Sequence, residues 1–288
     1  MALFFRSRSK PDRPEEQGQP SGRPDDGRMT LTEHLRELRR RLFICIAAIF
    51  IGFIVGWAFY ADISELLTDP YTSTVQRLAK EQGIDSRAVI QGVGTPFILQ
   101  AKVALVSGIV LASPIWLYQI WAFIVPGLHR NERKWTLVFV AIAGPLFLAG
   151  VVLGYVVLPK GLAVLIGFTP DQVTNLVDLN DYLSFVIRIL LVFGVAFEIP
   201  LFVVLLNLAG VVRGHHLARW RSWIIFGTFV FAAIATPSTD PITMLVLAVP
   251  MVLLFLLSEV IAHLVDRRRG VRRGAHYADL DDDEPSTL

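Results

Sequence analysis

Glu198 is the residue of this sequence whose chemistry most needs an explanation. It stands in the apolar run FGVAFEIPLF, two residues before Pro200. An ionised acid near the middle of a membrane costs at least about 2.5–3.5 kcal/mol, so we expect this glutamate to be protonated, paired, or exposed to a wet cavity. Pro200 removes a helical hydrogen bond at the same place. We therefore predict a functional role for Glu198.

Glu37 and Glu132 lie among basic residues instead. Glu37 belongs to the segment TLTEHLRELRRRL, in which leucines recur at helical spacing and predict a short helix on the membrane surface. There Glu37 can pair with Arg41, one turn further on, and the arginines can anchor the helix. Glu132 follows Gly127 in a short basic stretch and, taken alone, is a solvated loop charge. From spacing alone, both glutamates have a structural interpretation.

Membrane-spanning helices must position these acids. Of 288 residues, 53% are hydrophobic and 18% are charged, and the apolar residues fall in long runs. About 20 consecutive apolar residues are needed to cross a hydrocarbon core roughly 30 Å thick. The sequence therefore predicts an all-α integral membrane protein with six spans, at about 42–60, 97–125, 136–158, 182–208, 222–236 and 242–262.

Two features of these spans are unusual. Pro114 lies in the second span and Pro200 in the fourth, and each predicts a kink. The span at 222–236 would be only about 22 Å long, and the last span is also short. Such a pair of helices must thin the bilayer locally or pack behind longer helices.

The distribution of basic residues predicts the orientation. With the N-terminus inside, 21 Lys and Arg residues lie on the cytoplasmic side and 4 on the opposite side, so both termini are expected in the cytoplasm. We expect a disordered tail at 1–29, a membrane domain at 30–264 and a charged tail at 265–288. Two loops on the outer side, at about 61–96 and 159–181, are substantial.

Several classes of function lack their sequence signatures. There is no GxxxxGK[ST], HExxH, CxxC or GxSxG motif. Cys45 is the single cysteine, so no disulfide can form within the chain. A metal site at the adjacent His215 and His216 is not favoured. We expect no catalytic site, metal, cofactor or bound nucleic acid.

Three further charges have structural interpretations. Arg188, near the outer third of the fourth span, and Lys102, near the outer end of the second, can extend their charged ends toward water. Asp240, in the turn ATPSTDP, can cap the helix that begins beside Pro241. None of the three requires a functional role on this evidence.

Five segments, in this order and spacing, resemble the TatC family, the multispanning receptor subunit of the twin-arginine protein translocase. They are HLRELRRRL, SPIWLYQIWAFIVPGLHRNER, NDYLSFV, FGVAFEIPLFVVLL and ATPSTDP, and the resemblance runs from Thr30 to His263. It implies a concave bundle of six helices in the bacterial plasma membrane, with both termini cytoplasmic and the last two helices short. It also implies that the protein is not an enzyme.

The resemblance changes the interpretation of the acids. It implies that the chain binds signal peptides with paired arginines and nucleates transport of folded proteins, driven by the proton gradient. Each carboxylate can accept a forked contact from a guanidinium, which a lysine cannot make. The residues that the family pattern assigns to signal-peptide binding are Glu37, Glu132, Arg39, Arg41 and Phe123, and those assigned to the groove or to partner contact are Glu198, Pro70 and Asp240.

The implied partners are the single-span subunits TatA and TatB, further copies of the chain, and the lipid bilayer. Arg188 has no counterpart in the family pattern, and neither has the long tail rich in proline and arginine. The alternative function is a proton-coupled transporter of small solutes, with Glu198 as the proton carrier. An intramembrane enzyme would need a nucleophile and a base, and we find no such arrangement in the sequence.

Overall fold

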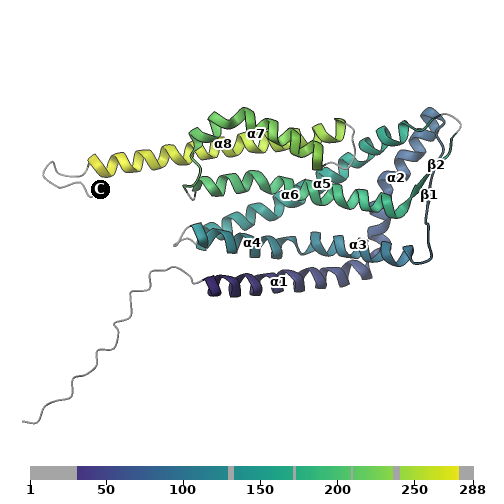
Figure 1. Ribbon diagram of the computed structural model, residues 1–288, viewed down its shortest axis with the longest axis horizontal. Coiled ribbons are helices and arrows are strands. Elements are labelled where there is room, and N and C mark those ends of the chain that lie inside the picture. The colour runs from purple at the N-terminus through teal and green to yellow at the C-terminus, as the bar shows by residue number, and fades with distance from the viewer. Residues whose placement is uncertain (1–30, 129–132, 171–172, 209, 236–240, 279–288) are drawn as a thin grey trace, which may run out of the picture. The chain divides into compact units, whose positions relative to one another are not determined.

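A computed structural model describes residues 31–128, 133–170, 173–208, 210–235 and 241–278. The chain divides into two units between Arg39 and Arg40. The elements, in order, are α1 (Leu31–Ala58), α2 (Tyr60–Gln82), β1 (Ser86–Val89), α3 (Thr95–Leu111), α4 (Ser113–Leu128), α5 (Arg133–Gly167), β2 (Asn175–Asp178), α6 (Leu179–Leu208), α7 (Gly214–Ala235) and α8 (Pro241–Ala278) (Figure 1).

Six membrane spans are consistent with the described helices. Five of them are long and apolar enough to cross a membrane, and α3 and α4 make a sixth if the bent pair is one span. The bend between α3 and α4 is 56° and falls at Ala112, two residues before Pro114. Pro114 is the second residue of α4, where its missing N–H breaks no helical hydrogen bond. The predicted kink of the second span is therefore a break between two helices.

Helix α7 is longer than the span predicted at 222–236. It begins at Gly214 and has 22 residues, which corresponds to about 33 Å. The predicted span began only after Arg219 and Arg221, the charged residues that precede the apolar run. Both arginines lie inside α7, so the helix begins before the apolar run does.

Helix α8 also extends beyond its prediction. Its 38 residues run to Ala278, past the predicted span at 242–262 and into the segment predicted as a tail at 265–288. The apolar part alone covers Thr243–Arg267. Arginine has a high helix propensity, so the basic residues after the span extend the helix rather than ending it.

The segments predicted as two outer loops are largely ordered, and they pair with each other. The first contains α2 and β1, and the second contains the end of α5 and all of β2. The two strands are parallel, from Ser86 opposite Asn175 to Val89 opposite Asp178. Helix α2 buries one face, which consists of Leu67, Pro70, Tyr71, Thr74 and Leu78.

The core lies chiefly between α5 and α6, which run side by side (Figure 1). Phe147 of α5 and Phe193 of α6 are both fully buried. Gly194 permits this packing, because a Cβ atom there would lie 2.6 Å from the ring of Phe147. Helix α1 approaches α3 in the same way, since a Cβ on Gly52 would lie 2.8 Å from the backbone of Gly108. Small residues thus set the closest helix contacts, as is usual in membranes.

Candidate functional site

Glu198 lies on α6, about 29 Å from the start of this helix at 1.5 Å per residue. Both carboxylate oxygens are buried, and neither has a hydrogen-bond partner among the described residues. Burying an ionised carboxylate without a partner is costly, so this position requires either a neutral acid or a group supplied from elsewhere. The structure therefore supports the expectation that this glutamate needs an explanation beyond packing.

Trp121 lies beside this carboxylate, and two further aromatic rings contact Trp121. Trp121 of α4 is 3% exposed, and its ring stacks on Phe139 of α5 with centroids 5.7 Å apart. The indole N–H of Trp121 faces Glu198 but does not reach hydrogen-bond geometry, and this nitrogen also has no partner among the described residues. Phe202, one turn after Glu198, lies 6.3 Å from Trp121 between ring centroids. The site is a buried acid beside an aromatic wall with an unused donor.

Helix α8 contacts α6 at Pro200. The side-chain hydroxyl of Ser258 is buried and lies 3.0 Å from the carbonyl oxygen of Pro200 and 2.8 Å from that of Leu254. One hydroxyl hydrogen can serve only one of these carbonyls at a time. Helix α6 continues through Pro200 to Leu208, so the residues around Glu198 remain helical.

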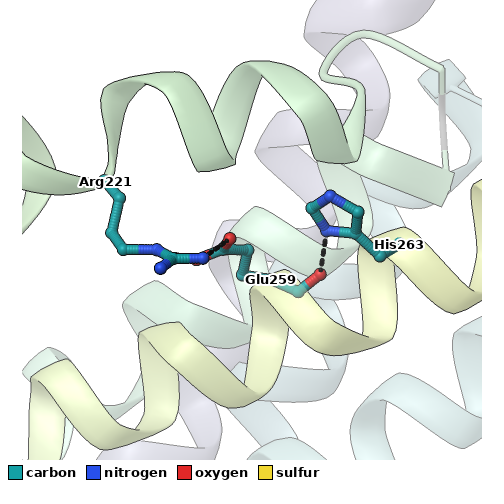
Figure 2. Close-up of polar contacts among 3 residues, drawn as sticks. All are labelled: Arg221, Glu259 and His263. Atoms are coloured by element: carbon teal, nitrogen blue, oxygen red, sulfur yellow. Dashed lines mark hydrogen bonds and ion pairs between the residues drawn. The ribbon is translucent and has the colours of Figure 1, made fainter.

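An ion pair that the sequence analysis did not predict joins α7 to α8. Figure 2 shows Arg221 of α7 extending to Glu259 of α8. Its Nε donates to Oε2 at 3.0 Å, and its Nη2 donates to Oε1 at 2.5 Å. The Glu259 side chain is 5% exposed and that of Arg221 52%. His263 lies one turn further on, with Nδ1 at 3.0 Å from the Glu259 carbonyl oxygen. The pair is 38 residues apart in sequence, so no local spacing signals it.

A second polar cluster holds the beginning of α7. The carboxylate of Asp266, on α8, accepts the backbone N–H of Gly214 at 2.6 Å and the side-chain amide of Asn207 at 3.2 Å. The amide of Asn207 also lies 2.9 Å from the carbonyl of Val212. An acid at a helix N-terminus satisfies an otherwise unpaired donor. This contact fixes the turn between α6 and α7 against α8.

The predicted signal-peptide residues lie on two helices. Glu37 and Arg39 are on α1, where Glu37 is half-buried and Arg39 is exposed. Arg41, also on α1, donates from Nη1 to Oε1 of Gln119 on α4 at 3.3 Å. Phe123 is half-buried on α4, one turn after Gln119. The structure thus links Arg41 to the helix that carries Phe123.

Two predicted site residues lie outside the described residues. Glu132 falls between α4 and α5, and Asp240 falls between α7 and α8. The convergence of Glu37 and Glu132 on one ligand therefore stays a prediction. The pairing of Glu37 with Arg41, on α1, stays a prediction as well. The same holds for the cap that Asp240 was predicted to form.

Pro70 is buried in α2, and its effect on the backbone is clear. Proline has no N–H, so in a helix it leaves the carbonyl four residues earlier without its usual partner. The hydroxyl of Tyr155, on α5, donates to that carbonyl, of Leu66, at 2.9 Å. The hydroxyl of Tyr182, on α6, donates to the next carbonyl, of Leu67, at 2.8 Å. Two tyrosines thus dock α2 where the proline opens it.

The two cations predicted to lie within spans differ in their surroundings. Lys102 of α3 donates from Nζ to Oδ1 of Asn180 at 2.6 Å and to Oγ of Ser184 at 2.8 Å, both on α6. It therefore holds α3 to α6 rather than extending freely toward water. Arg188 is exposed on α6. Among the described residues, no three His, Cys, Asp or Glu side chains form a candidate metal-ligand group.

These helices and the buried acid define a multi-pass integral membrane protein. Residues 33–250 match the family model for TatC, the Sec-independent protein translocase protein. The chain belongs to the TatC family. This match confirms the resemblance stated from the five segments. Members of the family are components of a protein translocase and are not enzymes.

Known relatives agree with this assignment. The chain is 45% identical over 270 residues to the Sec-independent protein translocase protein TatC of Frankia casuarinae, covering 92% of this chain and 74% of the relative. It is 41% identical to that of Corynebacterium kroppenstedtii, covering 91% and 68%. A crystal structure of the twin-arginine translocase receptor TatC in DDM is similar with a TM-score of 0.66 and 33% identity, covering 80% of this chain and 99% of that one.

Proposed function

We propose that this chain is the signal-peptide receptor of a twin-arginine translocase in a bacterial plasma membrane, with both termini in the cytoplasm. The observation that carries the proposal is the likeness to a solved twin-arginine translocase receptor, which extends over 80% of this chain at 33% identity. The orientation rests on the 21 basic residues on one predicted side against 4 on the other.

In this proposal, Glu37 and Glu132 bind the two arginines of the signal. An arginine guanidinium presents parallel donors that match both oxygens of a carboxylate, whereas a lysine ammonium offers a point charge. The neighbouring Arg39 and Arg41 would repel peptides that are merely basic. Arg41 is held by Gln119 of α4, the helix that carries Phe123. Phe123 would then contact the apolar residues that follow the arginine pair.

The apolar part of the signal would next approach Glu198. This carboxylate and the indole N–H of Trp121 both lack partners among the described residues, so an incoming helix can satisfy them with a polar side chain. Pro70 would act indirectly, through the position of α2, because it is buried. Asp240 would contact a partner from the turn before α8.

The proposed partners are the single-span subunits TatA and TatB and further copies of this chain. Helix α7 offers an exposed apolar surface to them or to lipid, which includes Trp220, Trp223, Phe226 and Ile234, all more than half exposed. Surfaces of this kind in a membrane protein are covered by lipid tails or by other helices.

Binding of a labelled twin-arginine signal peptide to the purified full chain in detergent tests the receptor. We expect tight binding that is lost with a twin-lysine peptide and with Glu37→Lys or Glu132→Lys, because each change removes a forked contact. Glu65→Lys is the matched control, since Glu65 is an exposed acid on α2, and it should bind like the wild type. Equal binding of both peptides, unaffected by the first two variants, would show that these acids are only surface charges.

The proton-coupled transporter is the second candidate, because a buried, unpartnered acid also suits a proton carrier. It predicts solute uptake by the chain alone in vesicles, lost in Glu198→Gln. The receptor proposal predicts instead that Glu198→Gln keeps signal-peptide binding and changes assembly with the partner subunits. Full transport of a folded precursor by Glu198→Leu would contradict any role of Glu198 in assembly.

A further inference from the structure

A cleft of about 230 Å³ opens between α2, the end of α5, β2 and the beginning of α6. Its walls are mainly apolar and aromatic, and they include the rings of Tyr71, Tyr182 and Phe185. The hydroxyl of Tyr71 is bound to that of Ser86, and the hydroxyl of Tyr182 donates to the carbonyl of Leu67. Both tyrosine hydroxyls are therefore engaged within the chain. We call this site the α6 cleft.

Besides the two tyrosines, the α6 cleft has two polar side chains, and both are hydrogen-bond acceptors. Asp181, in the first turn of α6, is exposed, and its carboxylate has no ion pair or hydrogen bond with the described residues. The side-chain nitrogen of Asn175 donates to Thr169 at 3.3 Å, which leaves the amide oxygen to accept. Acceptors beside aromatic rings favour a cationic group that carries N–H donors.

The charges at this end of α6 nevertheless balance. Asp178 and Asp181 are acids, and Arg188 on α6 and Lys102 against it are cations. Lys102 donates to the side-chain oxygen of Asn180, and Asp178 accepts the backbone N–H of Asn180 at 2.8 Å. With two charges of each sign, this end of the helix favours neither an anion nor a cation as a whole molecule. It suits a ligand that carries both charges.

The neighbouring elements do not supply the cation from within the chain. Among the described residues, Arg87 of β1 is paired with Asp85 at 3.2 Å. Lys160 lies two residues before Leu162, which lines the α6 cleft from α5. Residues two apart in a helix point to nearly opposite sides, so Lys160 lies on the side away from the cleft.

The order of the groups along α6 narrows the ligand further. Asp181, Phe185 and Arg188 lie on one side of the helix, because they are four and three residues apart. Asp181 and Arg188 are about 10 Å apart along the axis and form no ion pair with each other. Val192 and Val195 continue the same side toward the middle of the span, and Val195 is 53% exposed. This side therefore presents an acid, then a cation, then an apolar surface.

A phospholipid with an ethanolamine headgroup carries the complementary groups in the same order. Its ammonium lies farthest from the middle of the bilayer, the phosphate follows, and the acyl chains lie deepest. The molecule has no net charge. Its primary ammonium can donate to both Asp181 and Asn175, whereas the trimethylammonium of a choline headgroup has no N–H to donate. A lysine side chain from a protein partner would bring no phosphate for Arg188.

We propose that the α6 cleft binds one molecule of phosphatidylethanolamine. Its ammonium pairs with Asp181, its phosphate lies at Arg188, and an acyl chain follows Val192 and Val195. The site goes beyond the proposed receptor function, because that function assigns none of these residues to the signal peptide. It makes this protein selective for one headgroup at one end of its spans.

Native mass spectrometry of the full chain in detergent tests the selectivity. Phosphatidylethanolamine, phosphatidylcholine and phosphatidylglycerol with identical acyl chains are added in turn, and the fraction of protein with one bound lipid is measured against lipid concentration. We expect phosphatidylethanolamine to bind about tenfold more tightly than either other lipid, which is the effect of one charge-assisted hydrogen bond.

Charge variants establish which residue reads which part of the headgroup. Asp181→Asn should remove most of the preference for ethanolamine over choline, and Asp181→Lys should shift the preference to phosphatidylglycerol. Arg188→Gln should weaken binding of the ethanolamine and choline lipids alike, because both carry the phosphate. Glu65→Gln is the matched control, since Glu65 is an exposed acid on α2 that does not line the cleft, and it should bind like the wild type.

A variant that changes no charge tests the cleft itself. Leu165→Trp places a larger side chain on its α5 wall and should weaken binding of phosphatidylethanolamine. Unfolding at the wild-type Tm in detergent without added lipid shows that a variant is folded. Asp181→Asn, which is exposed and nearly equal in shape, decides the test if Leu165→Trp unfolds earlier.

Three outcomes would overturn the inference. The first is equal binding of the three lipids by the wild type, and the second is an ethanolamine preference that survives in Asp181→Asn. The third is tighter binding of phosphatidylglycerol than of phosphatidylethanolamine, which would assign Arg188 and Lys102 to an anionic headgroup.

Discussion

Charged side chains inside the spans of this protein differ in how they are compensated. Glu259 is paired with Arg221, and Lys102 donates to neutral oxygens of Asn180 and Ser184. Glu198 has no partner among the described residues. Compensated charges hold helices together, whereas an uncompensated one favours a ligand that supplies the missing group. The proposed contact with an incoming helix therefore involves Glu198 and not the ion pair.

The ion pair between α7 and α8 should respond asymmetrically to mutation. Arg221→Met leaves the buried carboxylate of Glu259 without its donor, whereas Glu259→Gln leaves a half-exposed arginine that can reach water. Breaking a fully buried pair costs about 3–5 kcal/mol. Because the Arg221 side chain is half-exposed, we expect Arg221→Met to lower stability by less than this. Thermal unfolding in detergent should show a lower Tm for Arg221→Met than for Glu259→Gln.

The double variant Arg221→Met with Glu259→Met is the control for this prediction. Replacing both partners of a buried pair by apolar residues is often neutral or stabilising. We expect it to recover most of the stability that Arg221→Met loses. Equal Tm values for the wild type and Arg221→Met would show that the pair contributes nothing to holding α7 against α8.

At the scale of elements, the segments predicted as outer loops form helix and strand rather than loop. Helix α2 packs on α5 and α6, and β1 pairs with β2, so that Ser86 lies opposite Asn175, 89 positions further along the chain. Helix α2 is less apolar than the spans and carries its proline in the interior. It is stable in this position because it buries an amphipathic face and because Tyr155 and Tyr182 satisfy the carbonyls near Pro70.

Coupling between Pro70 and Tyr155 tests this account. Tyr155→Phe should lower the stability of α2 by about 0.5–1.5 kcal/mol, because the carbonyl of Leu66 loses its donor. In a Pro70→Ala background residue 70 regains its N–H and can itself pair with that carbonyl. Tyr155→Phe should then cost clearly less. Hydrogen exchange of the amides of α2 measures both costs. Equal costs in the two backgrounds would mean that the proline does not create the acceptor that Tyr155 uses.

At the scale of the whole molecule, the orientation decides which sites meet the signal peptide. The predicted arrangement places Glu37 on the cytoplasmic side and the β1–β2 pair on the outer side. A Cys45→Ser background allows single cysteines to be labelled in intact cells. We expect Thr174→Cys to react with a membrane-impermeant maleimide, since Thr174 is exposed. Cysteines at Ser9 and Thr287 should react only after the membrane is opened, and labelling of either in intact cells would contradict the orientation.

The sequence by itself determined the class of the protein, because crossing a membrane imposes long apolar runs that can be counted. It also determined the family, through segments such as FGVAFEIPLFVVLL and ATPSTDP. Glu198 could be singled out for the same reason: an acid in an apolar run has a known cost. The lengths of α7 and α8 could not be predicted from hydropathy, because charged residues interrupt an apolar run without interrupting a helix.

Only the tertiary structure decided which charges are compensated. Arg221 and Glu259 meet across 38 residues of sequence, and Lys102 reaches Ser184 across 82. Such distances leave no periodic signal. The tertiary structure also decided the effect of Pro70. Tyrosines of α5 and α6 donate to the carbonyls near this proline, so α2 is held against both helices there. The local sequence determines which backbone carbonyl lacks its helical donor. Packing between distant segments determines which side chain donates to that carbonyl instead.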